Sequence, residues 1–580
     1  MKNITSVILI LVAFCITESL SGLSARLEAG TTKNPWPSVR HDLLNGGAAP
    51  DFGYPTTPKI AWKVNRSDRP DKPGTPAGAG GSAAVDKGMV FTTGQGIVEA
   101  RDQYTGNLIW SKAFPWTDTA VEPADTPDDW CYGDIATLGS GNTGVCYVPD
   151  LSQCPSWCLQ CTTVKPDCSS LSVINPLRLG EGYGQFISSP TLDTPSNLLA
   201  FGTFDARVIA LNMETGSTVW ERTPFKDPGG PNEGRPWYDQ KFAWHLSAPS
   251  IADGHVYIGS FLPSFYYIFR YPPFGKAIYG SDFHTYWMGH DGWFYALDEN
   301  DGSILWTWNP QGCGVANVPP VDSNGNVYAQ DDFHTTTCNG LLQSFDSNGN
   351  PRWTLGPVPV AQGGSPSISG STIFIPMSDG VLWALDKDSG ALKWTYHGGF
   401  CIKGNSGLTS STAVDERHGL VLGASDTGHI FVLDKKTGRL VREAYLGVPG
   451  WKPGDNIPQS GFWFPGAGSM AIVPSQKLLY IAGTDYERAW QGQFTKGKEK
   501  LFCYYYGGPG AKLILLWEYQ FCLDDDACAD LDSQHIVRGW EEQSSSFYNV
   551  PSPALADGHV YYNSMNGKVY CFGRPFRSTP

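Results

Sequence analysis

Charged residues are scarce in this chain of 580 residues. Only 17% of the residues are Asp, Glu, Lys or Arg, against roughly 25% in ordinary soluble domains. The chain has no run of Lys or Arg, and its net charge is −15. Both features argue against nucleic acid or an anionic membrane surface as a partner. The motifs Gly-x-Ser-x-Gly, His-Glu-x-x-His and the P-loop are also absent, so three well-marked kinds of catalytic or nucleotide site find no support.

Long apolar runs are missing as well. Residues 7–16 are apolar and follow Lys2, but this run is shorter than the ~20 residues that span a bilayer. Small residues, Ser19 and Ser21, come next at positions suited to a cleavage site. We therefore expect residues 1–21 to be a signal peptide, no membrane span, and a secreted or lumenal protein.

The cysteines fit an oxidising compartment. Of 14 cysteines, one lies in the expected signal peptide and six lie between Cys131 and Cys168. We expect these six to form disulfides within an insertion at 115–187, with further pairs Cys313/Cys338 and Cys522/Cys528. The residue after Cys158-x-x-Cys161 is Thr162, so the pattern for haem attachment is not met. Asn65-Arg66-Ser67 is an acceptor for N-glycosylation.

Glycine, proline and aromatic residues are abundant. The chain has 67 Gly, 43 Pro and 13% aromatic residues, which excludes a coiled coil or a long helical bundle. Disorder is excluded because 41% of the residues are hydrophobic and can form a large core. The composition indicates many short strands joined by tight turns.

A repeat carries the strongest signal. An apolar alternating run leads to Asp or Asn, then Gly four residues later, then Trp after four more. The Asp side chain can accept hydrogen bonds from its own turn, and Gly can adopt the positive φ, so each unit predicts a β-hairpin. The units that follow this pattern are Asp102–Trp110, Asn212–Trp220, Asp298–Trp306 and Asp386–Trp394, with a shorter one at Asp346–Trp353 and a variant at Asp434–Arg442.

A second hairpin precedes each of these units, as in residues 247–260 and 552–564. Gly302, Gly349, Gly390 and Gly438 follow one another at intervals of 41 to 48 residues. Four strands per unit at this spacing predict propeller blades. We expect an all-β fold, an eight-bladed β-propeller over 22–580. We expect residues 58–64 to form the outer strand of the last blade and close the ring.

The chain resembles the quinoprotein alcohol dehydrogenase-like superfamily of β-propellers, which are built from PQQ repeats. The resemblance rests on the pattern Ala-Leu-Asp-x-x-x-Gly-x-x-x-Trp and covers nearly all of the mature chain. Trp36-Pro37 to Gly46 is similar to the segment that leads into these propellers. WD40 repeats have a similar period, but the Trp-Asp dipeptide that they need is missing at the blade ends.

The extra length of the chain lies in a few connections. Each of these connections follows either a second or an outermost strand of a predicted blade. They are residues 115–187, 224–246, 261–291, 397–409, 447–467 and 522–550. In a propeller both types of connection open on one face, where the resemblance implies a cofactor at the mouth of the channel. Two near-copies, 281–285 and 331–335, supply Asp and His at equivalent connections. Duplication of a loop with Asp and Thr turn bonds explains them equally well.

The candidate site residues come from these connections. The catalytic candidates are Asp282, His284, Asp332, His334 and Asp485; the cofactor-binding candidates are Trp463, Lys403, Asn405 and Arg488; the metal candidates are Asp426 and Glu487. Carboxylates suit a calcium ion or a base, cations suit an anionic ligand, and Trp suits a planar ring. Solvated surface charge and packing at the rim are the alternatives.

Three functions stay open. The first is a PQQ-dependent oxidoreductase with calcium that acts on an alcohol or a similar small molecule. Alcohol dehydrogenases of the superfamily have adjacent cysteines over the cofactor, and this chain has none. It also lacks a haem domain, so an external electron acceptor would be needed. The second is a cofactor-free enzyme or small-molecule-binding propeller, and the third is a protein-interaction scaffold.

Overall fold

A computed structural model describes most of the chain between residues 32 and 576. The expected signal peptide and most of the insertion at 115–187 lie outside the described residues. These are 32–70, 72–115, 145–147, 160–162, 187–203, 205, 207–224, 227–229, 247–260, 293–310, 315, 317–330, 341–356, 364–377, 380–398, 408, 410–425, 428–445, 460–463, 469–488, 494–521 and 551–576.

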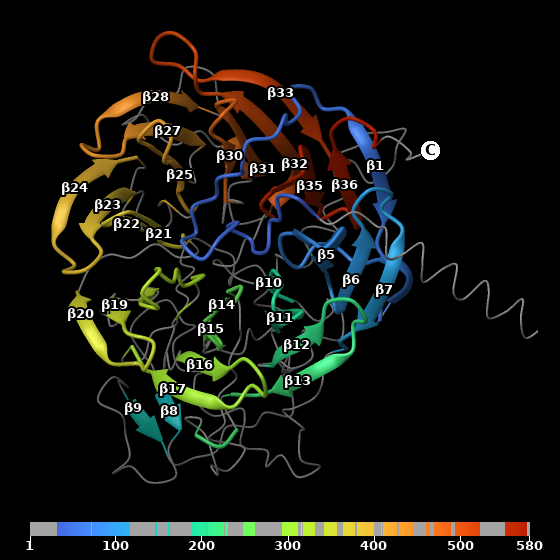
Figure 1. Ribbon diagram of the computed structural model, residues 1–580, viewed down its shortest axis with the longest axis vertical. Coiled ribbons are helices and arrows are strands. Elements are labelled where there is room, and N and C mark those ends of the chain that lie inside the picture. The colour runs from blue at the N-terminus through green and yellow to red at the C-terminus, as the bar shows by residue number, and fades with distance from the viewer. Residues whose placement is uncertain are drawn as a thin grey trace, which may run out of the picture.

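Eight β-sheets stand around a ring as blades (Figure 1). Among the described residues all regular secondary structure is β-strand, and no α-helix occurs. The all-β, eight-bladed propeller predicted from the repeat is confirmed. Within the described ranges, no helix has the length and apolarity that crossing a bilayer requires.

The first four blades follow one another along the chain. Blade 1 is β4 (Ala84–Asp86), β5 (Met89–Thr93), β6 (Ile97–Asp102) and β7 (Leu108–Ala113); blade 2 is β10 (Thr191–Asp193), β11 (Leu198–Gly202), β12 (Val208–Asn212) and β13 (Thr218–Arg222); blade 3 is β14 (Ser250–Ala252), β15 (His255–Gly259), β16 (Phe294–Asp298) and β17 (Ile304–Trp308); blade 4 is β18 (Val327–Gln330), β19 (Leu342–Phe345) and β20 (Pro351–Leu355).

The other four blades complete the ring. Blade 5 is β21 (Ser367–Ser369), β22 (Thr372–Pro376), β23 (Val381–Asp386) and β24 (Leu392–His397); blade 6 is β25 (Ala413–Asp415), β26 (Leu420–Ala424), β27 (His429–Asp434) and β28 (Leu440–Tyr445); blade 7 is β30 (Ala471–Val473), β31 (Leu478–Arg488), β32 (Phe494–Tyr505) and β33 (Ile514–Gln520), with β29 (Ser460–Trp463) added to β31; blade 8 is β34 (Ala554–Ala556), β35 (His559–Asn563), β36 (Lys568–Phe572) and β1 (Ile60–Asn65). Two short pairs lie outside the blades: β2 (Asp68–Arg69) with β3 (Lys72–Pro76), and β8 (Val145–Tyr147) with β9 (Gln160–Thr162).

Blade 4 has one strand fewer than the repeat predicts. Its innermost position holds Pro319-Pro320, and proline has no N–H to donate to a sheet. Only an isolated bridge remains there, between Val321 and Val327.

Burial explains the sequence pattern of the strands. Second and third strands, such as β11 and β12, are buried almost throughout because a neighbouring blade covers each of their faces. They therefore read as nearly continuous apolar runs. The outermost strand β24 alternates between exposed and partly buried positions and reads as a half-buried strand.

The repeated Gly and Trp form the contacts between blades. A Cβ at Gly438, where φ is +70°, would lie 2.5 Å from Cε3 of Trp394 in the preceding blade, so only glycine fits. The Trp394 indole N–H also donates to the Lys435 carbonyl across the same interface, at 3.2 Å. The same Gly–Trp contact occurs at Gly106–Trp62, Gly216–Trp110, Gly302–Trp220, Gly349–Trp306 and Gly390–Trp353. Arg442, which replaces the repeat Trp in blade 6, donates from Nη2 to the Gly508 carbonyl at 2.8 Å.

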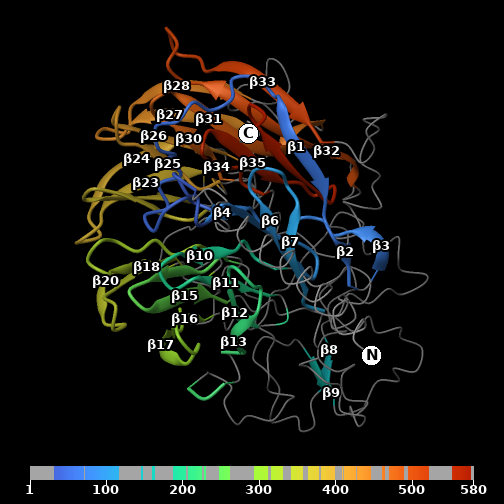
Figure 2. The same cartoon turned by 45° about the vertical axis from the view of Figure 1, so that its right-hand side comes forward.

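The N-terminal strand β1 lies in the last blade, beside β36 (Figures 1 and 2). The two strands are antiparallel, and Lys63 lies opposite Tyr570. Arg66 follows β1 and is buried. It donates to the Gly78 carbonyl at 3.1 Å and, in a short bond, to the Asn563 side chain on β35.

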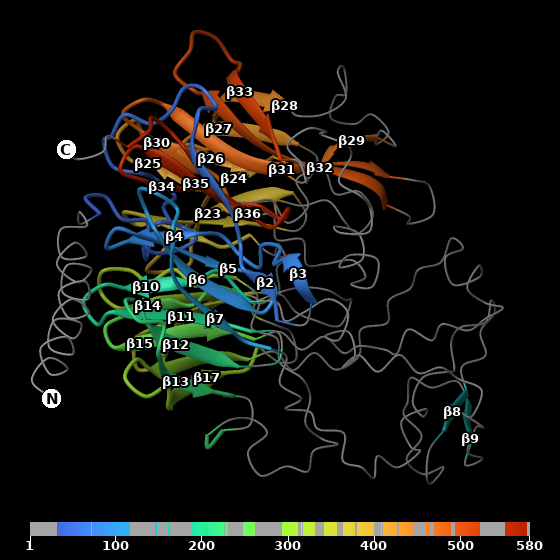
Figure 3. The ribbon, with the colours of Figure 1, turned by 90° about the vertical axis from the view of Figure 1, so that its right-hand side faces the viewer.

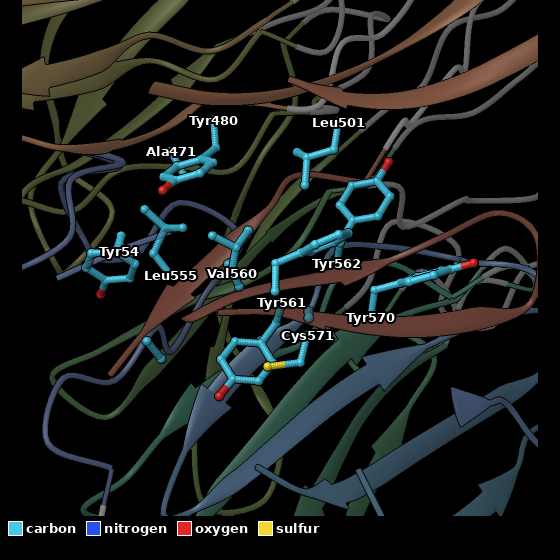
Figure 4. Close-up of a cluster of buried hydrophobic side chains, with 14 of the residues drawn as sticks. Tyr54, Ala471, Tyr480, Leu501, Leu555, Val560, Tyr561, Tyr562, Tyr570 and Cys571 are labelled. Carbon is cyan, nitrogen blue, oxygen red and sulfur yellow. The ribbon is translucent and has the colours of Figure 1, made fainter. Parts of the chain in front are cut away.

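The largest buried cluster packs blade 7 against blade 8 (Figure 4). Tyr480 and Leu501 from blade 7 meet Leu555, Val560 and other residues of blade 8 there. Each is fully buried. The cluster also includes Val85 and Val90 of blade 1, so apolar surface from both neighbouring blades packs against blade 8, and burial of such surface is the main source of stability in a core.

Two of the cysteines can be followed in the described core. Cys503 and Cys571 are free and buried. Of the six clustered cysteines, Cys146 on β8 lies opposite Cys161 on β9 in a parallel register. The disulfides expected in this insertion stay a prediction.

Candidate functional site

The topology sorts the connections onto two faces of the ring. Adjacent strands within each blade are antiparallel, so the connections from second to third strand and from outermost strand to the next blade meet one face. We call it the mouth face. The opposite face has the short turns between first and second strands, such as Asp253-Gly254 and Asp557-Gly558.

The segment Trp36–Ala49, here called the axial segment, lies inside the ring near the face opposite the mouth. Its carbonyls accept hydrogen bonds from the central residue of the innermost strand, or its equivalent, in blades 1, 2, 4, 5, 6 and 7. The donors are the backbone N–H groups of Val85, Leu192, Val321, Ile368, Val414 and Ile472, at 2.7–2.9 Å. Figure 1 shows this dark blue segment crossing the middle of the ring. It satisfies strand edges that would otherwise face the axis unpaired.

A ring of serine side chains lies on the mouth side of these bonds. In this ring Ser82 N–H donates to Ser189 Oγ, and Ser552 N–H donates to Ser82 Oγ, at 2.8 and 2.7 Å. Matching bonds join Val318 to Ser365 and Ser365 to Ser411. Each bond links one blade to the next, so the inner wall is held together by polar contacts.

Most of the predicted site residues lie outside the described part of the chain. These are Asp282, His284, Asp332, His334, Lys403, Asn405 and Asp426. By chain position the first two follow β15 and the next two follow β18, which are connections of the mouth face. Their roles stay predictions.

The other four predicted residues lie on strands of blade 7. Trp463 ends β29, and Asp485, Glu487 and Arg488 lie near the end of β31. The backbone register pairs Trp463 with Thr484, next to Asp485, and pairs Ser460 with Glu487. The fold thus places Trp463 on a strand paired with the one that holds the other three positions, which follow Trp463 by 22 to 25 residues in sequence.

Blade 7 extends beyond the other blades at the mouth face. Its strands β31 and β32 contain 11 and 12 residues, against five or six in the matching strands of blades 5 and 6. Figure 3 shows β29 and the outer ends of β31 and β32 projecting past the ring on one side. Trp463 and the three charged positions on β31 lie on this projection.

Glu499 is buried at the base of the projection. Its carboxylate accepts from the Tyr562 hydroxyl at 2.7 Å, the Ser564 hydroxyl at 2.5 Å and the Met565 N–H at 3.1 Å. Burial raises the pKa of Glu499 to about 7, against the opposing effect of these three hydrogen bonds. This carboxyl can therefore gain or lose a proton near neutral pH.

The sequence contained a signal for Glu499 that our reading of the repeat missed. The backbone carbonyl of Glu499 accepts a hydrogen bond from Phe521 N–H, as the Gly96 carbonyl accepts one from Phe114 N–H in blade 1. Gly380 takes the same role in blade 5. A glutamate where other blades have a turn glycine marks the place at which the blade 7 hairpin continues past the ring.

Three other buried ionisable groups, in blades 1, 2 and 6, lie beside a partner of opposite charge. Arg101 and Glu99 form an ion pair at 3.0 Å in blade 1, and Arg207 pairs with Asp205 at 2.7 Å in blade 2. In blade 6 His429 lies 3.0 Å from Glu443, and burial is the main cause that lowers its pKa. The His429–Glu443 pair joins β27 to β28, whereas the other two pairs each lie within one short stretch of chain. Among the described residues, no group of three or more His, Cys, Asp or Glu side chains is arranged to hold a metal.

Comparisons with known proteins identify the repeat. Residues 290–450 match the PQQ_2 family model, described as outer membrane protein assembly factor BamB. The resemblance to PQQ-repeat β-propellers is therefore confirmed. A comparison with curated proteins finds no match.

Solved structures are similar at low identity. The quinohemoprotein alcohol dehydrogenase from Comamonas testosteroni is 15% identical, with 94% of this chain and 82% of that chain covered and a TM-score of 0.41. BamB from Moraxella catarrhalis is 14% identical over 66% of this chain and 93% of that chain, with a TM-score of 0.34. A europium-containing methanol dehydrogenase is 12% identical over 91% and 81%, with a TM-score of 0.40. These likenesses are too distant to support an inference about activity.

Proposed function

We propose that the protein is a secreted PQQ-type oxidoreductase that oxidises an alcohol or a similar small molecule and passes electrons to an external acceptor. The observation that carries the proposal is the asymmetry of the ring. The axial segment hydrogen-bonds to six blades near one face, while the blade 7 projection extends from the other. A ligand of the ring would therefore bind at the mouth face, where the sequence concentrates its candidate residues.

The proposed site has a role for each kind of residue. Trp463 would stack on the quinone, and Lys403, Asn405 and Arg488 would bind its carboxylates. Asp426 and Glu487 would hold calcium, which prefers carboxylate oxygens. Asp485, Asp282 or Asp332 would accept the alcohol proton, with His284 and His334 as hydrogen-bonding partners. When bound, PQQ supplies the two-electron acceptor that the protein's side chains lack.

A turnover assay tests the proposal. The full chain, supplied with PQQ and Ca²⁺, should reduce an electron-accepting dye in the presence of an alcohol. Asp485→Asn should abolish turnover and leave the unfolding midpoint unchanged, because Asn keeps the shape of Asp without its charge. Asp51→Asn is the matched control, since Asp51 is exposed and pairs only with Arg417 among the described residues. Equal activity in both variants would refute a role for Asp485.

A protein-interaction scaffold is the second candidate. It is favoured by the family model that residues 290–450 match, whose description is an assembly factor. A protein that binds no PQQ and no small molecule, yet copurifies with one partner at fixed stoichiometry, would favour this candidate. Either function is compatible with secretion, and sequencing the purified protein's N-terminus should show cleavage after residue 21.

A further inference from the structure

Arg40 is a buried cation with unused hydrogen-bonding capacity. Only 1% of its surface is exposed. Its Nη2 donates to the Asn45 carbonyl at 3.1 Å and, in a short bond, to the Thr412 carbonyl of blade 6. Its Nε and Nη1 atoms are buried and have no hydrogen-bond partner in the described part of the chain. A guanidinium has five N–H donors, so three of them lack an acceptor there.

Arg40 forms no ion pair with a described residue, although the charge of Asp42 attracts it. Asp42 is its neighbour in sequence, but the Asp42 carboxylate accepts from the N–H groups of Leu44 and Gly46 and lies 3.5 Å from His41. The two carbonyls that Arg40 contacts carry no net charge. Burial lowers the pKa of Arg40 to about 9, against the opposing attraction of the Asp42 charge. A buried charge without a partner is costly, and proteins nearly always pair one.

Arg40 belongs to the inner wall of the ring. The Asn45 side chain donates to the carbonyls of Val318 and Pro366, which precede the innermost strand positions of blades 4 and 5. Asn317 comes directly before Val318. It is 2% exposed, and neither its amide nitrogen nor its amide oxygen has a hydrogen-bond partner among the described residues. Buried polar atoms without a hydrogen-bond partner among the described residues therefore occur both on the axial segment, at Arg40, and on the inner wall of blade 4, at Asn317.

We propose that a small anion, a halide or a small carboxylate such as formate, binds inside the ring against Nε and Nη1 of Arg40. An anion satisfies the free N–H groups and balances the buried charge, whereas water satisfies only the first requirement. The site lies on the axial segment, away from the blade 7 projection, and does not depend on the proposed oxidoreductase function. The anion would fasten the axial segment to blade 6.

Bromide provides a direct test. Crystals of the full chain grown in sodium bromide should give an anomalous peak within hydrogen-bonding distance of Arg40 Nε and Nη1. In solution, sodium chloride, bromide or formate should each raise the unfolding temperature in a saturable way, by about 2 °C or more. The reference is sodium gluconate at equal ionic strength, whose anion is too bulky for such a site. A larger response to formate than to the halides would identify a carboxylate site.

Arg40→Met should abolish this anion dependence, and Arg40→Lys should retain part of it. The matched control is Arg417→Met, because the Arg417 side chain is 55% exposed; it should keep the full response. The proposal is overturned if Arg40→Met responds to anions as the wild type does. It is also overturned if the bromide crystals show only water beside Arg40, a result that stands even if Arg40→Met fails to fold.

Discussion

Replacing Glu499 by Gln should make the stability of this protein less dependent on pH. The Glu499 carboxyl is completely buried, and its pKa rises from 4.5 to about 7 on folding. The folded state therefore holds this proton more tightly than the unfolded state. The resulting stabilisation is fully present below pH 4.5 and is lost as pH rises through 7.

The magnitude follows from the shift. Each pKa unit corresponds to about 1.36 kcal/mol, so the wild type should lose about 3 kcal/mol between pH 4.5 and pH 8.5 through this one group. Gln can keep partners for these donors if its oxygen takes the place of Oε1, which accepts from the Tyr562 hydroxyl and, at 3.3 Å, from the Met565 N–H. Its NH₂ group can then donate to the Ser564 hydroxyl. The free energy of unfolding of the Glu499→Gln variant should thus be close to that of the wild type near pH 5. At pH 8.5 it should be about 3 kcal/mol higher than that of the wild type.

The assay is urea unfolding followed by tryptophan fluorescence at pH 5 and pH 8.5. Glu518→Gln is the matched control, because Glu518 lies in the same blade and its side chain is 47% exposed. The free energy of unfolding of Glu518→Gln should differ from that of the wild type by no more than about 0.5 kcal/mol at both values of pH. If Glu499→Gln and the wild type respond equally to pH, the carboxyl does not titrate in this range and our reasoning about its burial is wrong.

Three further predictions test the ring. Arg66→Met should lower the free energy of unfolding by at least about 2 kcal/mol in urea, because it leaves the Asn563 side-chain oxygen of blade 8 and the Gly78 carbonyl without their donor; a change below about 0.5 kcal/mol would contradict a closing role. Gly438→Ala should lower the free energy of unfolding by about 2 kcal/mol more than Gly510→Ala does. Both glycines have a positive φ, but a Cβ at Gly438 alone of the two would meet a tryptophan ring. Equal losses of unfolding free energy in the two variants would mean that the contact with the ring is unimportant. Peptide mapping without reduction should recover Cys146 linked to Cys161, because adjacent strands have a spacing that suits a disulfide; free thiols at both positions would exclude it.

The fold could be predicted because its repeat is local. The turn from Asp386 to Gly390 closes within five residues, and its Asp accepts from the Ser389 N–H in the structure. The number of blades follows from repeating that unit. The three strands of blade 4 were harder to predict, since the loss of one strand depends on where Pro319-Pro320 falls relative to the axis.

The site was less predictable because it depends on contacts between distant segments. The position of Arg40 depends on Thr412, 372 residues away, and no local pattern records that contact. Glu499 depends on blade 8 in the same way. Its replacement of a repeat glycine is visible in the sequence, but the burial that shifts its pKa is a property of the packed ring.

The central claim is that the mouth face binds PQQ, and a binding titration tests it most directly. Purified full-length protein should be titrated with PQQ in the presence and absence of Ca²⁺, with bound PQQ followed by its absorbance and by mass spectrometry under native conditions. We predict one PQQ per chain, binding that requires Ca²⁺, and affinity at least tenfold weaker in Glu487→Gln. No saturable PQQ binding with Ca²⁺ present would contradict the account.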